Sequence, residues 1–174
     1  MNGDCQMTNE AISDTGPILH LNEIGKLESL NIFERLYVTG LVANELSSYD
    51  FDVLSLDLKT QISLVDVNDE NRFHEITKLI SKPIHPADTE VFILARDKNY
   101  SIPILTDDLT LRRQLEQQGA LVIGTIGILV KAYHNGLMNR EDLEGAIDLL
   151  FEESNLFISR AFRSYIRKLL ANLK

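Results

Sequence analysis

Short apolar runs alternate with amphipathic stretches along most of this 174-residue chain. Residues 17–33, 87–98 and 109–119 place apolar side chains at helical spacing. The runs between them are short and aliphatic or β-branched, as strands are: Ala11 with Ile12, "RLYVTG", "QISLVDV", "SIPILTDD" and "ALVIGT". This alternation predicts a three-layer α/β/α fold, in which helices cover both faces of a central parallel sheet. The length suits a single domain over residues 1–174.

The pattern of the last fifth of the chain, residues 139–174, predicts a C-terminal helical extension of two helices. The second has an apolar stripe that includes Phe162, Ile166 and Leu169, which we expect to pack on the sheet or on another subunit. Three arginines lie opposite this stripe and are interpreted as a solvated face: Arg160, Arg163 and Arg167. Residues 47–61 have no assignable pattern.

Composition excludes several classes of protein. The formal net charge of −9 argues against an extended nucleic-acid-binding surface, so any nucleic acid must be bound locally. No apolar stretch approaches the ~20 residues that span a bilayer, and the N-terminus lacks the pattern of a secretion signal. Cys5 is the only cysteine, which rules out an internal disulfide. We therefore expect a cytoplasmic protein without a membrane partner.

Acidic residues recur where predicted strands end and helices begin. Asp14 follows the first strand, Asp108 follows "PILT", and Glu90 lies in the early turns of the helix that begins near Pro86. In a parallel sheet these positions share one edge, where ligands usually bind. Glu45, on a short helix after "YVT", is placed to join them from the side. The sequence thus predicts a cluster of four carboxylates from separate segments.

Such a cluster needs a way to relieve charge repulsion. Closely packed carboxylates must either hold protons or share a cation. Oxygen ligands without a companion His or Cys favour Mg²⁺ or Mn²⁺ over zinc. Sites of this kind serve mainly phosphoryl and phosphodiester chemistry, so hydrolysis of a phosphodiester fits the pattern.

Five segments, in order and spacing, resemble the PIN-domain nucleases, in particular prokaryotic ones akin to VapC-type toxins. They are "ISDTGPIL", "VANEL", "ADTEVFILA", "ILTDDLTLRR" and "GTIGILVKAYHNGL", and together they extend from about Ala11 to Leu137. The resemblance implies a PIN-like fold and metal-dependent endoribonuclease activity on an RNA substrate. It also implies a toxin held inactive by an antitoxin, and self-association into a homo-oligomer. The family's four acids correspond to Asp14, Glu45, Glu90 and Asp108.

On this basis each candidate residue is given a role. Asp14 and Asp108 are expected to bind Mg²⁺ or Mn²⁺ directly, with Glu90 completing the coordination and Glu45 holding a coordinated water. Thr15 and Thr106 are expected to fix the carboxylates by hydrogen bonds.

The sequence leaves the roles of some neighbouring residues open. Asp88 is treated as an outer ligand at best, because residues two apart on a helix do not share a face. Asp107 and Asp108 are each suited to start the next helix as its N-cap. Arg112 and Arg113 fit equally a contact with RNA phosphate and a solvated helix face.

Each acid alone also has an ordinary explanation as a turn, cap or helix-terminus residue. The joint placement favours a site, whereas a catalytically inactive PIN-like binding module would lack one or more of the acids. "DTG" is also the signature of aspartic proteases, but those are all-β and need a second copy that this chain lacks. The histidines lack metal-ligand spacing and are interpreted as surface or structural residues: His20, His74, His85 and His134.

Overall fold

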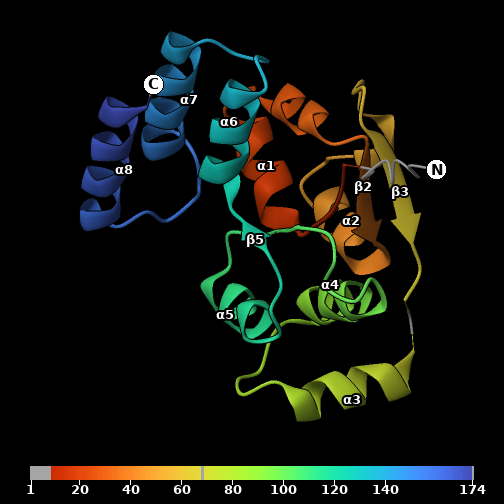
Figure 1. Ribbon diagram of the computed structural model, residues 1–174. Helices are drawn as coiled ribbons and strands as arrows, with labels where there is room; N and C mark the ends of the chain where they lie inside the picture. Colours follow the sequence, from red (N-terminus) through yellow and green to blue (C-terminus); the bar gives the residue numbers. More distant parts are fainter. Residues whose placement is uncertain (1–8, 68, 174) are drawn as a thin grey trace, which may run out of the picture.

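Five parallel strands form the centre of the structure, a computed structural model that describes residues 9–67 and 69–173. The order across the sheet is β3-β2-β1-β4-β5, and helices lie on both faces (Figure 1), which confirms the predicted three-layer α/β/α architecture. The strands are β1 (Glu10–Ser13), β2 (Arg35–Thr39), β3 (Gln61–Val65), β4 (Ile104–Leu105) and β5 (Val122–Ile123).

The hydrophobic core lies on both sides of the central strand β1. Ala11 and Ile12 point to opposite faces of the sheet, and neither is exposed at all. Ile12 pairs with Tyr37 of β2 and with Ile104 of β4. Both faces of the sheet are therefore covered, which explains why its strands read as short continuous apolar runs.

The helices form two groups that contact the sheet. α1, η1 and α6 contact one another, and α6 also contacts α7. α2, α3 and α4 form the second group, in which α4 is buried along most of its length. The helical elements are α1 (Thr15–Glu23), η1 (Leu27–Ile32), α2 (Gly40–Ser47), η2 (Val53–Ser55), α3 (Glu70–Leu79), α4 (Pro86–Asp97), α5 (Leu109–Gln117), α6 (Thr125–His134), α7 (Arg140–Glu152) and α8 (Arg160–Asn172).

The structure corrects three sequence predictions. The helical pattern over residues 17–33 belongs to two elements, α1 and η1, because Gly25 between them adopts a φ of 64° that ends the first helix. Helix α3 was not predicted; its segment is mostly polar, and Ile76 is its one fully buried side chain. Helix α8 packs against α7 and not on the sheet (Figure 1), so the first of its two expected positions is wrong, while packing on another subunit stays a prediction.

Parallel strands bring all of their carboxyl ends to one edge of the sheet. From β1 the chain proceeds to β2 and β3 on one side, and later to β4 and β5 on the other. The boundary between β1 and β4 is therefore the switch point of the topology, where α/β proteins usually bind their ligands. Among the described residues, no helix is both long enough and apolar enough to cross a membrane.

Candidate active site at the carboxyl edge of the sheet

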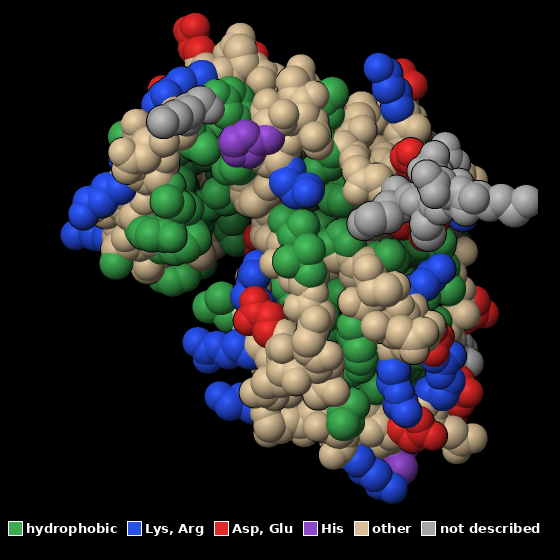
Figure 2. Space-filling model, viewed as in Figure 1, with side chains coloured by type: hydrophobic (Ala, Val, Ile, Leu, Met, Phe, Trp, Pro, Cys, Tyr) green, Lys and Arg blue, Asp and Glu red, His purple; other side chains and the backbone are tan. Residues whose placement is uncertain are grey.

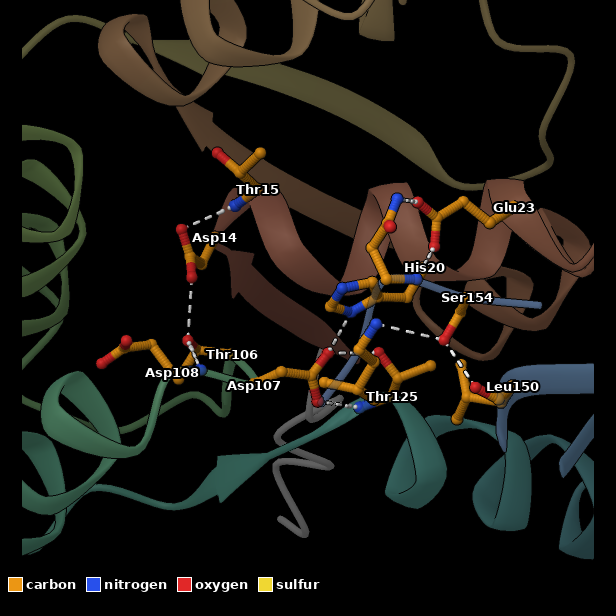
Figure 3. A network of polar contacts seen from close by, with 12 residues as sticks. Asp14, Thr15, His20, Glu23, Thr106, Asp107, Asp108, Thr125, Leu150 and Ser154 are labelled. Atoms are coloured by element: carbon orange, nitrogen blue, oxygen red, sulfur yellow. Dashed lines mark hydrogen bonds and ion pairs between the residues drawn. The ribbon is translucent and has the colours of Figure 1, made fainter. Parts of the chain in front are cut away.

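Asp14 lies at the switch point, directly after β1, and its side chain is almost completely buried. Its Oδ1 accepts a hydrogen bond of 2.6 Å from the backbone N–H of Thr15, which caps α1. Its Oδ2 accepts a bond of 2.8 Å from the hydroxyl of Thr106, which follows β4 (Figure 3). Asp14 is thus held from both sides of the switch point.

Asp108 is joined to Asp14 through the same threonine. Its backbone N–H donates to Thr106 Oγ1 at 3.1 Å, so this hydroxyl accepts from Asp108 while it donates to Asp14. The Asp108 carboxylate caps α5 by accepting from the N–H of Leu111 at 2.7 Å, and the residue is exposed. One carboxylate of the pair is therefore buried and the other is open to a ligand.

Glu45 reaches the site through Thr15. The Thr15 hydroxyl donates to Glu45 Oε2 at 2.6 Å, which connects the first turn of α1 to α2. Glu45 is exposed, while Thr15 is buried. The two threonines thus position carboxylates in the way that the sequence suggested.

Asp88 and Glu90 point to different surroundings, as expected for residues that lie about 200° apart around a helix. The Glu90 carboxylate accepts from the backbone N–H of Leu41 at 2.8 Å and so caps the first turn of α2. Asp88 accepts from the N–H of His85 at 3.2 Å in the first turn of α4. Both acids are buried. Glu90 as a metal ligand remains a prediction, although the structure gives its carboxylate a different partner.

The pKa values show which acids share an electrostatic environment. The pKa of Asp14 is raised to about 6, mainly by burial. The hydrogen bonds from Thr106 and Thr15 lower it, and the charges of Glu45 and Asp108 raise it. Burial raises the pKa of Asp88 to about 7, helped by the charges of Asp14 and then Asp108. Asp88 therefore belongs to the same group of acids as Asp14 and Asp108. We expected a raised pKa in this cluster, but not Asp88 as the acid with the larger shift.

Asp107 faces away from this group and serves a second network. Its Oδ1 accepts from the backbone N–H of Thr125 at 2.8 Å, and its Oδ2 accepts from the Thr125 hydroxyl. His20 Nδ1 lies 2.8 Å from the same Oδ2, and both side chains are nearly buried (Figure 3). Asp107 thus fastens α1 and the start of α6 to the loop after β4. Sequence reasoning missed this use of His20, since the two residues are 87 positions apart.

The two arginines of α5 differ in their surroundings. Arg112 donates to the carbonyls of Val122 at 3.1 Å and Thr106 at 3.2 Å, and it also forms an ion pair with Glu116. These bonds tie α5 to the ends of β4 and β5. Arg113 is exposed, so both readings, a contact with RNA phosphate and a solvated helix face, stay open for it.

The acids at the switch point have no cationic partners among the described residues. In the described part of the chain, no Lys or Arg forms an ion pair with Asp14, Asp88 or Asp108. Oxygen ligands with uncompensated charge fit a divalent ion such as Mg²⁺. The same described residues contain no group of three or more His, Cys, Asp or Glu that is already arranged to hold a metal ion.

Comparison with known proteins gives the class to which this fold and site belong. A family model described as a PIN domain, DUF3368, matches residues 10–172, so the chain belongs to this family of PIN domains. The match includes all of α7 and α8. No curated protein and no solved structure matches the chain significantly. PIN domains are generally nucleases, which makes the chain a member of a nuclease family.

The Asp107 network gives a prediction about Gly124. A Cβ at this position would lie 2.8 Å from Asp107 Oδ1 and 3.1 Å from Arg112 Nη2. We expect Gly124→Ala to lower the free energy of unfolding by about 2 kcal/mol, because Asp107 and Arg112 would have to move. Gly145→Ala is the control, since its Cβ meets nothing within 4 Å on helix α7. That change should raise stability by about 0.5–1 kcal/mol. Urea unfolding measures both, and equal effects would contradict the crowding argument.

Asp88 gives a prediction about pH. Its folded pKa of about 7 exceeds the ordinary 3.8, so its contribution to stability is full below pH 3.8 and is lost as the pH rises through 7. In EDTA, the free energy of unfolding of the parent should fall between about pH 4 and pH 8. In Asp88→Asn this fall should be smaller by about 2 kcal/mol, a figure that allows for solvent near the group. The control is Glu152→Gln, at an exposed position of α7. Its free energy of unfolding should fall with pH as it does in the parent. A decline that is unchanged in Asp88→Asn would contradict the assignment.

Proposed function

We propose that this PIN domain is a metal-dependent endoribonuclease. The observation that carries the proposal is the pair of carboxylates, Asp14 and Asp108, that Thr106 joins across the switch point. One is buried with a raised pKa and the other is exposed at the rim, where a phosphodiester can approach. The choice of RNA as the substrate rests on the resemblance to VapC-type toxins.

In this proposal Asp14, Asp108 and Asp88 hold Mg²⁺ or Mn²⁺. A divalent ion bound there activates water and neutralises charge that develops on the phosphate. Thr106 and Thr15 keep the carboxylates in fixed orientations, and Glu45 holds a water molecule beside them. Glu90 contributes from the side of α2, as a ligand in the original assignment or by fixing the first turn of that helix.

The partners and the cellular role also follow the resemblance. We propose a cytoplasmic toxin whose antitoxin places a basic side chain, such as Arg, among the acids of the site. This is consistent with the absence of ion pairs to Asp14, Asp88 and Asp108 among the described residues. We also propose that the chain forms a homo-oligomer.

The alternative is a PIN-like module that binds partners without catalysis. One observation favours this alternative. The described residues contain no group of three or more His, Cys, Asp or Glu that could hold a metal ion. Against it, all four acids of the family pattern are present, and Asp88 adds a fifth. An assay of RNA cleavage distinguishes the two functions.

A cleavage assay tests the proposal. Purified protein is incubated with mixed RNAs and with single-stranded DNA, first with Mn²⁺ and then with excess EDTA. We expect RNA to be cut at internal positions with Mn²⁺ and not with EDTA. RNA that stays intact with every divalent ion would support the binding module instead.

The same assay tests Asp14 directly. Asp14→Asn keeps the shape of the side chain but removes a charged ligand, so we expect cleavage to fall by about 100-fold or more. The metal-free fold should be at least as stable as the parent near neutral pH, because a carboxylate with a raised pKa is destabilising when charged. Glu152→Gln removes a charge elsewhere and should cut like the parent. Full activity of Asp14→Asn would refute the site.

A further inference from the structure

The C-terminal segment differs sharply in charge from the rest of this acidic chain. Residues 154–173 contain no Asp or Glu, whereas α8 carries four cations: Arg160, Arg163, Arg167 and Lys168. Taking these four from the net charge of −9 leaves −13 on the remainder of the chain. A strand of polyanion would therefore be repelled by most of the molecule and attracted to this helix.

Two of the four cations are held by neighbours on α7, and two are not. Arg167 forms an ion pair of 3.0 Å with Asp148, and Arg163 lies over the ring of Phe151 at 5.1 Å. Arg160 and Lys168 are exposed and form no ion pair within residues 9–67 and 69–173. These two side chains are thus available to phosphate groups.

Aromatic rings accompany the cations. Phe157, just before α8, is 92% exposed, which is unusual for a large apolar side chain. Phe162 and Tyr165 on α8 are about half exposed, and their rings are stacked with centroids 6.1 Å apart. Figure 2 shows hydrophobic side chains gathered at this end of the molecule, with Lys and Arg along its outer edge. The surface combines flat apolar rings with positive charge.

The start of this surface is tied to the helix that begins at the active site. The side chain and backbone N–H of Asn155 both donate to the carboxylate of Glu23, at 2.7 and 2.9 Å. Glu23 ends α1, and Asp14 caps its other end, so the two lie about 13 Å apart along the helix. Figure 3 shows Glu23 and Ser154 close together, with His20 and Asp107 between them and the acids Asp14 and Asp108 in this view. The loop before α8 is therefore joined to α1 at the end opposite Asp14.

We propose that α8 and Phe157 form a binding surface for single-stranded RNA that leads the strand toward the acids at the switch point. The proposal rests on the proposed function, since it names where the substrate binds outside the acidic centre. Bases stack on the exposed rings, and the backbone phosphates contact Arg160 and Lys168. This combination is how proteins hold single strands without reading their sequence.

Two other occupants fit the surface less well. If α8 paired with α8 of a second copy about a two-fold axis, the same cations would face each other in one interface. An anionic membrane would need the whole apolar face of the helix, but Ile166 and Leu170 already pack inside the protein. RNA uses the exposed rings and the cations together.

Fluorescence anisotropy of a labelled single-stranded RNA measures the binding. All proteins carry Asp14→Asn and the buffer contains EDTA, so that the strand is not cut. Arg160→Glu and Lys168→Glu should each weaken binding about fivefold and lower the slope of log affinity against log salt by about 0.7. Phe157→Ser should weaken binding by about fivefold or more. Lys78→Glu is the matched control, as an exposed lysine reversed on helix α3, and it should bind like the parent.

Three results would overturn the proposal. The first is equal RNA binding by the parent and the α8 variants. The second is the absence of RNA binding by the parent, with or without binding to phosphatidylserine vesicles. The third is a parent dimer that the α8 changes dissociate, as seen by sedimentation, while RNA binding stays unchanged.

Cleavage in Mn²⁺, measured with Asp14 restored, separates this proposal from the proposed function. Active α8 variants that bind like the parent refute only the RNA surface, and binding through α8 without cleavage refutes only the nuclease.

Discussion

The hydroxyl of Thr106 is the contact on which the candidate site depends. It donates to Asp14 at the end of β1 and accepts from the N–H of Asp108 at the start of α5. Because β1 and β4 are neighbours at the switch point, this single group fixes two acids that are far apart in sequence. Burying a carboxylate without a positive partner is costly and raises the pKa of Asp14. The hydrogen bonds from Thr106 and Thr15 offset part of this cost and hold the carboxylate in place.

Around this contact the fold uses polar side chains to join elements that pack on different layers. Asp107, next to Asp108, holds His20 of α1 and Thr125 of α6, while Arg112 holds the carbonyls at the ends of β4 and β5. The two adjacent aspartates therefore have different roles. One faces the candidate metal site, and the other connects α1 and α6 behind it. This explains why the loop after β4 carries two acids in succession.

The sheet and the placement of Asp14 and Asp108 could be predicted from the sequence, because apolar periodicity is a local property and parallel strands end at one edge. Contacts across the chain could not. His20 and Asp107 meet only in the folded protein. The geometry of α4 brings Asp88 to the acids and sends Glu90 to Leu41, although spacing alone showed only that the two cannot share a face. Helix α3 is a mostly polar segment with one fully buried side chain, and the sequence analysis did not assign it.

The central claim is that the acids at the switch point bind a divalent metal ion. Calorimetric titration of Mn²⁺ into the parent and into Asp14→Asn and Asp88→Asn measures this binding without a substrate. The account predicts that the parent binds Mn²⁺ and that each substitution weakens the binding by at least about tenfold, since each removes a charged oxygen ligand. Binding that is equal in all three proteins, or absent from the parent, would contradict it.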